Sequence, residues 1–171
     1  MGSIWPGLVR VIELTVSDAS GNVLSVQRDL RNILHQDGEA FILRAAFIGG
    51  QNSSVIPSFY YLGLDNRAAV AAADTIDDLS GEPTGNGYER QQISSNGSFA
   101  LNLEDGHYLA TSPIVSFRAV SGNWGPVANL FLTDKADDTG SLISTVVLAS
   151  PISLTSGTGV TLRIGMQIKD C

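Results

Sequence analysis

A chain of 171 residues, 43% hydrophobic and 16% charged, has the length and composition of one folded domain. Its net charge of −7 repels phosphate backbones, which argues against a nucleic-acid partner. The longest apolar stretches, such as FILRAAFI, fall far short of the roughly 20 residues that cross a bilayer, and the N-terminus lacks the apolar run of a signal peptide. These properties predict a soluble protein made in a cytoplasm, without a membrane partner.

The first 57 residues are predicted to form a hairpin followed by a helix. Val9–Ser17 and Val23–Leu30 alternate partly between apolar and polar residues, and small and polar turn residues separate them. Asp37 is then expected to cap a helix that has Glu39 in its first turn and stops at Gly49-Gly50. A single helix of this length is expected to cover part of a sheet.

Residues 58–169 are predicted to form short strands separated by turns, which is typical of an all-β sandwich or barrel. The segment Asn66–Leu79 is compatible with a helical turn or an extended arm, and both alternatives stay open. The predicted strands are Phe59–Asp65, Tyr88–Ser94, Ser98–Leu103, His107–Ala110, Ile114–Val120, Val127–Thr133, Leu142–Ala149 and Val160–Lys169.

The sequence therefore predicts one domain over residues 1–171, an antiparallel β-sandwich of jelly-roll type with one short helix. Residues 58–169 are expected to form the main sandwich, and residues 1–57 an added element that could dock onto another protein. The core is expected to be built from pairs of apolar residues two positions apart, which share one face of a strand. These residues are Leu62, Leu64, Val115, Phe117, Leu130, Leu132, Val146, Leu148, Leu162 and Ile164.

The stretch GEPTGNGYERQQI, residues 81–93, resembles a ligand loop but lacks the Gly-Lys-Ser/Thr ending of a phosphate loop. Its Gly-Asn-Gly core suits a sharp reversal, because these residues adopt positive φ at low cost. Tyr88, Arg90 and Gln92 would then share one face of a partly exposed strand and are the candidates for a contact with a neighbouring subunit. The alternative is that Tyr88 caps the core and Arg90 forms a local salt bridge.

Catalytic and metal-binding chemistry is poorly represented in the sequence. The two histidines, His35 and His107, belong to no nucleophile motif and are interpreted as structural or surface residues. The single cysteine, Cys171, excludes an internal disulfide and is interpreted as an incidental tail residue, with an intermolecular disulfide as the alternative. We expect no cofactor and no enzymatic activity.

Two groups of carboxylates lie in predicted loops, where calcium would find oxygen ligands. Neither group has the spacing of a twelve-residue calcium loop, so they are interpreted as solvated turn residues. The groups are Asp74, Asp77, Asp78 and Glu82, and Asp134, Asp137 and Asp138.

A carbohydrate-binding module, such as a fibre tip, is the main alternative function. Such modules stack sugar rings on exposed aromatic side chains and hold the hydroxyl groups with polar ones. The candidates here are Trp124 with Asn123, and Tyr60 or Tyr61 with Asp65. The competing interpretation of Trp124 is a strand-end residue that packs against the core.

Four features occur in a fixed order after residue 58: an aromatic strand, the GNGYERQ turn, an isolated tryptophan in GNWGPV, and a closing pair of glycine-containing segments. This order resembles a group of small virion proteins of tailed bacteriophages, described as tail-fibre-like or minor structural proteins. The residues that carry the resemblance are Gly85, Gly87, Tyr88, Arg90, Gln91, Trp124, Gly125, Val127, Gly140, Ser141, Leu142, Ile143, Gly157, Leu162 and Ile164.

The resemblance implies a non-enzymatic structural protein located in the virion. Its expected partners are other copies of itself and other virion proteins, as a capsid-decorating or tail-associated subunit. Exposed strand edges need to be paired or covered, which favours a homo-oligomer or attachment to a protein shell. The resemblance carries no catalytic residues onto this chain.

Overall fold

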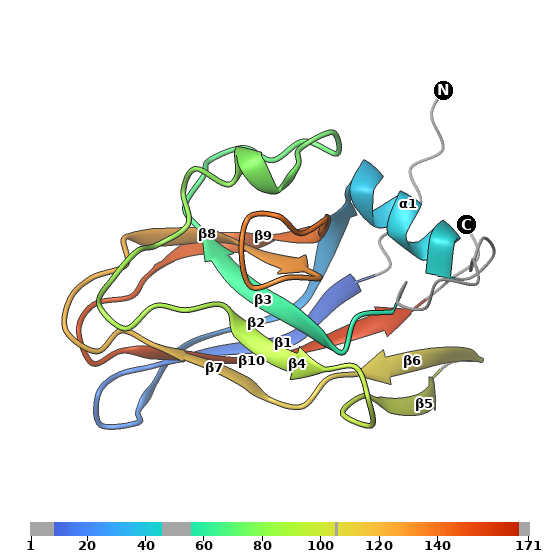
Figure 1. Cartoon of the computed structure of the whole chain (residues 1–171). Coiled ribbons are helices and arrows are strands. Elements are labelled where there is room, and N and C mark those ends of the chain that lie inside the picture. The colour runs from blue at the N-terminus through green and yellow to red at the C-terminus, as the bar shows by residue number, and fades with distance from the viewer. Residues whose placement is uncertain (1–8, 46–55, 105, 168–171) are drawn as a thin grey trace.

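The computed structural model describes residues 9–45, 56–104 and 106–167, and shows a mostly antiparallel β protein with one α-helix (Figure 1). The predicted fold class, an all-β antiparallel fold with one short helix, is therefore confirmed. The helices are α1 (Gln36–Leu43) and the 3₁₀ turn η2 (Ile76–Asp78). The strands are β1 (Val9–Ser17), β2 (Val23–Leu34), β3 (Phe59–Asp65), β4 (Gln91–Ser94), β5 (Ala100–Glu104), β6 (His107–Thr111), β7 (Val115–Arg118), β8 (Pro126–Thr133), β9 (Leu142–Ser153) and β10 (Gly159–Gln167).

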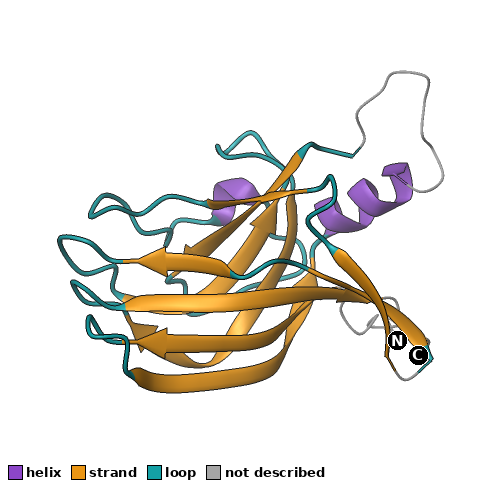
Figure 2. Ribbon diagram, turned by 90° about the horizontal axis from the view of Figure 1, so that it is seen from below, coloured by secondary structure: helices purple, strands orange, loops and turns teal. Residues whose placement is uncertain are grey.

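The ten strands follow the order β4-β3-β8-β9-β2-β1-β10-β6-β5, and β7 pairs with β10 beside β6. The sheet curls until its two halves face each other (Figure 2). Strand β2 belongs to both halves, because it pairs with β1 over most of its length and with β9 only through Asn32–Leu34. The jelly-roll topology expected from the sequence is not confirmed.

The core lies between the two halves of the curled sheet. All ten residues predicted for it are at most 6% exposed, as expected from the alternation of apolar residues along each strand. Val9, Val11, Leu14 and Val16 of β1 belong to the same core cluster. The N-terminal hairpin therefore lies within the sheet, between β9 and β10, and shares its core with the strands of residues 58–169.

A second, smaller core lies on the other face of the β3-β8-β9 half. It contains Ile76 and Leu79 from the segment after β3, and Phe131 and Leu142 from β8 and β9. The segment Asn66–Leu79, left open by the sequence, is thus a loop with one 3₁₀ turn that packs on the sheet. Gly63 makes room for the Phe131 ring, which a Cβ at that position would overlap.

The prediction that Asp37 caps the helix is wrong, because the helix begins at Gln36 and the N-cap is His35. Tertiary contacts fix this start: the His35 amide donates to the Ile143 carbonyl at 3.2 Å, and its Nε2 lies 2.8 Å from Thr145 Oγ1. Asp37 and Glu39 both occupy the first turn. Helix α1 covers β9, and Gly38 permits close contact with the Ile143 backbone.

Candidate functional site

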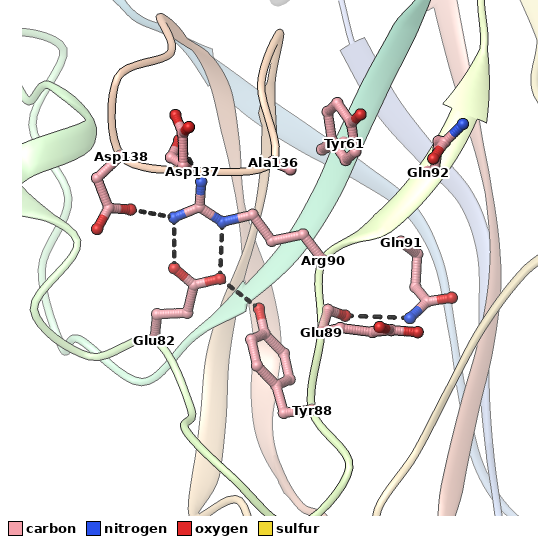
Figure 3. Close-up of a pocket in the computed structure, with 10 residues that line it drawn as sticks. All are labelled: Tyr61, Glu82, Tyr88, Glu89, Arg90, Gln91, Gln92, Ala136, Asp137 and Asp138. Atoms are coloured by element: carbon pink, nitrogen blue, oxygen red, sulfur yellow. Dashed lines mark hydrogen bonds and ion pairs between the residues drawn. The ribbon is translucent and has the colours of Figure 1, made fainter.

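A pocket that is open to solvent and has a volume of about 690 Å³ lies at the turn that precedes β4 (Figure 3). Most of the residues that line it come from the GEPTGNGYERQQI stretch and from the β8–β9 loop. They are Tyr61, Glu82, Tyr88, Glu89, Arg90, Gln91, Gln92, Ala136, Asp137 and Asp138. The pocket therefore contains all three residues predicted to contact a neighbouring subunit.

The Gly-Asn-Gly turn reverses the chain ahead of the pocket through three consecutive residues with positive φ. Gly85, Asn86 and Gly87 have φ of 68°, 50° and 81°. Side chains other than glycine and asparagine adopt this region at a cost, which explains the composition of the turn. The turn closes with a 2.9 Å hydrogen bond from the Tyr88 amide to the Gly85 carbonyl and directs Tyr88 toward the core.

The Arg90 guanidinium is the centre of the pocket wall, and its side chain is only 6% exposed. It forms a two-pronged ion pair with Glu82, with Nε 2.9 Å and Nη2 2.6 Å from the two carboxylate oxygens. Nη2 also donates to Asp138, and Nη1 donates to the Asp137 carbonyl at 2.8 Å. The guanidinium lies 5.1 Å from the centre of the Phe131 ring, within the range of a cation–π contact.

Tyr88 connects this ion pair to the main core. Its ring stacks on Phe117 and meets Trp124 edge-on, with centroid distances of 6.3 and 5.4 Å. Its hydroxyl donates to Glu82 at 2.8 Å and accepts the Leu64 amide at 2.9 Å. Burial, and then the negative charge of Glu82, raise the pKa of Tyr88 above its ordinary value, so the hydroxyl stays protonated.

We call Glu82, Tyr88, Arg90, Phe131 and the Asp137–Asp138 segment the Arg90 cluster. It connects the stretch before β4 with strand β8 and the loop that follows it, and Arg90 and Asp138 are 48 residues apart in the sequence. Two-pronged ion pairs with arginine fix geometry as well as adding energy. The arrangement stabilises two loops, because the Arg90 nitrogens already donate hydrogen bonds to Glu82 and Asp138 (Figure 3).

The predicted strand Tyr88–Ser94 is wrong in its first three residues, because β4 begins at Gln91. Residues 88–90 leave the sheet so that Tyr88 and Arg90 can make the contacts described above. Both side chains contact their own chain, as the alternative from the sequence predicts. Gln92 is exposed on β4, and a contact between it and a neighbouring subunit stays a prediction.

The residues considered for carbohydrate binding do not gather into one surface site. Trp124 is 4% exposed and Asp65 is fully buried, so neither can contact a sugar ring. Tyr60 packs edge-on against Phe41 and Phe99, while Tyr61 lines the open pocket. Asn123 is exposed and accepts a hydrogen bond from the Ser156 amide.

A buried polar network under the Asn66–Leu79 loop was missed by the sequence reasoning. Arg67 lies between Asp65 and Asp74, with nitrogen–oxygen distances of 2.8 and 3.1 Å. Asn129 of β8 donates to the Arg67 carbonyl at 2.7 Å and to Asp65 at 3.4 Å. The Asp65-x-Arg67 spacing at the end of a buried strand is the one indication of this network that the sequence contains.

His35 lies beside this network and is fully buried, with Thr145 as its hydrogen-bond partner. Burial lowers its pKa, and the Asp74 carboxylate opposes this effect. The interpretation of His35 as a structural residue agrees with these contacts. Gly49, Gly50 and Cys171 lie outside the residues that the structure describes.

Among residues 9–45, 56–104 and 106–167, no group of three or more His, Cys, Asp or Glu side chains could hold a metal ion. In the same part of the chain, no helix has both the length and the apolar character needed to cross a membrane. Comparisons with protein-family models, with curated proteins and with solved structures find no significant match to this chain.

Proposed function

We propose that this chain is a non-enzymatic structural subunit of a bacteriophage virion, which assembles with copies of itself and with neighbouring capsid or tail proteins. One observation carries the assembly part of the proposal. On the strands, the large apolar side chains that are more than half exposed fall into two groups, and the β1–β2 turn and the β5–β6 hairpin that carry them lie at opposite ends of the molecule (Figure 1). They are Val23 and Leu24 beside the β1–β2 turn, and Leu101, Leu103 and Tyr108 on β5 and β6.

Exposed apolar groups favour association, most of all on the edge strand β5, because an edge offers unpaired amides and carbonyls along with its side chains. Two such ends on one subunit suit contacts with two neighbours, as in a shell or a tail. By contrast, Tyr88 and Arg90 of the open pocket are engaged with Glu82 and Asp138 of their own chain, which supports a structural role for that stretch.

The virion part of the proposal is supported by the order of motifs in the sequence. The GNGYERQ turn and the GNWGPV segment are in contact, through the rings of Tyr88 and Trp124. The segment before Gly140 contacts the first motif as well, through Asp138 and Arg90. The three segments that carry the resemblance therefore pack together at one corner of the fold.

Mass spectrometry of density-purified particles, prepared from a lysate that contains this protein, tests the proposal. We expect the chain to remain with the particles in a fixed ratio to the major capsid or tail protein. Recovery of the chain only as free protein, with none in the particle fraction, would contradict a role in the virion.

A further inference from the structure

The β5–β6 hairpin, residues 100–111, is held firmly to the rest of the sheet on one side. Strand β6 pairs with the end of β10 through residues 109–111, and the Leu109 side chain is buried. Glu104 at the tip of the hairpin accepts a 3.0 Å hydrogen bond from Arg10 of β1. At the base of the hairpin, Pro113 lies between the end of β6 and the start of β7. Beside it, the Ser112 hydroxyl accepts a 3.1 Å hydrogen bond from the Ile164 amide, in place of a backbone carbonyl.

The face of the hairpin opposite to the buried Leu109 side chain is apolar and exposed. Leu101 and Leu103 are 68% and 64% exposed, and Tyr108, which pairs directly with Leu103, is 64% exposed. Ala110 lies on the same face, opposite Met166, which packs against the main core. The face of the sheet that is buried in the core thus continues onto the hairpin, where no described strand covers it.

Strand β5 is also the last strand of the sheet. Among the strands that the structure describes, it pairs with β6 alone. Alternate residues of such a strand direct their amide and carbonyl groups outward, where another strand can bind them. An exposed apolar face and a free backbone edge therefore occur together on five residues.

The sequence of β5, Ala100-Leu-Asn-Leu-Glu104, is complementary to itself when read in the opposite direction. With Asn102 at the centre, each Leu101 lies opposite the Leu103 of a second copy, and Asn102 lies opposite its own equivalent. Ala100 lies opposite Glu104, so no two like charges meet. Glu104 is the only charged residue of the strand, and it is already paired with Arg10.

We propose that β5 pairs antiparallel with β5 of a second copy of this chain, with the two-fold axis at Asn102. The pairing joins two sheets into one and places Leu101 and Leu103 of each copy beside Leu103 and Leu101 of the other, on the same face as Tyr108 of the neighbouring strand. Such a contact is isologous, and it closes after two copies. The inference rests on the proposed function only in that both require the chain to assemble.

The contact is small. A pair of five-residue strands with two leucine side chains on each copy covers less than the roughly 1,600 Å² of a standard protein interface. We therefore expect a dimer that depends on concentration in solution. In an assembly where other contacts already hold the subunits together, the effective concentration of the two strands is much higher.

Disulfide trapping tests the pairing in the full-length chain. In a Cys171→Ser background, Asn102→Cys places two thiols opposite each other, since directly opposed Cβ atoms lie about 4.5–5.5 Å apart, close to disulfide range. We expect mild oxidation to give at least about tenfold more linked dimer than Val120→Cys, whose site is also exposed but lies outside the hairpin.

A second substitution separates pairing from random collision. Adding Leu103→Lys to the Asn102→Cys chain should abolish cross-linking, while adding Val120→Lys should leave it unchanged. Circular dichroism establishes that both chains are folded. Equal cross-linking at positions 102 and 120, or cross-linking that survives Leu103→Lys, would overturn the proposal.

Sedimentation of the unmodified chain distinguishes the other occupants of this edge. A chain that stays monomeric at every concentration, because its own segment or a different protein covers β5, would also overturn the proposal. That result leaves the virion role to be decided by the particle analysis, which does not depend on β5.

Discussion

The side chains of the Arg90 cluster contact their own chain, whereas the apolar side chains of the β5–β6 hairpin point into solvent. In the Arg90 cluster, the residues most favoured in protein interfaces, tyrosine and arginine, contact their own chain and satisfy each other's hydrogen bonds. In the hairpin, two leucine side chains of the kind that build cores are exposed to solvent, together with Tyr108. Residue type alone favours the first region as a contact surface, whereas exposure and strand pairing favour the second.

This difference has an energetic basis. The side chains of Arg90 and Glu82 are mostly buried, so removal of either one would leave the charge of the other poorly hydrated and without a partner. Leu101 and Leu103 leave apolar surface in water, so the free energy gained by covering it is still available to a partner. The first region stabilises the fold, and the second is suited to association.

Arg90→Ala should have the largest effect on stability. It leaves the partly buried Glu82 carboxylate without its partner and removes the contact with Phe131, and we expect a loss of roughly 2–3 kcal/mol in the free energy of unfolding. Arg28→Ala is the matched control, because Arg28 pairs with Glu13 at a similar distance on the surface. The control should lose at most about 1 kcal/mol in the same urea titration. Equal losses would contradict the role of burial.

Tyr88→Phe should have an intermediate effect, since it leaves the Leu64 amide without its acceptor at a cost of about 1–2 kcal/mol. The effect of the substitution on the free energy of unfolding also depends on pH. The pKa of Tyr88 is raised in the folded state, so folding is disfavoured as pH rises above about 10, where the unfolded tyrosine loses its proton.

The free energy of unfolding of the unmodified protein should therefore fall above about pH 10, and that of Tyr88→Phe should fall less. Part of the decrease should remain in the variant, because burial also raises the pKa of Tyr60. Urea titrations at pH 8 and at pH 11 measure both effects. An identical decrease in the two proteins would show that Tyr88 ionises normally.

Gly85→Ala should have the smallest effect. A Cβ at this position meets no atom within 4 Å, so the expected loss of about 1 kcal/mol comes from the positive φ alone. Gly87→Ala should lose more, because its Cβ would also lie 2.8 Å from Val120 Cγ2. The two midpoints of thermal unfolding separate backbone strain from steric contact, and the reverse order would contradict this account of the turn.

The strands and the core could be predicted from the sequence because alternation is a local property. Leu62 and Leu64, or Leu130 and Leu132, identify the buried face of a strand without knowledge of its neighbours. The left-handed Gly-Asn-Gly turn was predictable for the same reason, since it depends on three adjacent residues. The curled order of the strands was not, because it depends on pairing between distant segments.

The candidate site was harder to predict, because its contacts join residues far apart in the chain. Arg90 reaches Asp138, 48 residues away, and this contact removes residues 88–90 from the strand that their alternation indicates. Trp124 is buried because the ring of Tyr88 covers it, and Arg67 is paired because the loop that contains Asp74 folds over the sheet. None of these pairings follows from local periodicity.

The most direct test of the whole account compares Arg90→Ala with Leu103→Lys in two measurements, thermal unfolding and sedimentation over a range of concentrations. We predict that Arg90→Ala lowers Tm by roughly 5–10 °C and that its folded fraction still dimerises. Leu103→Lys should leave Tm nearly unchanged and remain monomeric, because its side chain is exposed in the single chain. The reverse pattern, with dimerisation lost in Arg90→Ala at unchanged Tm and retained in Leu103→Lys, would contradict the account.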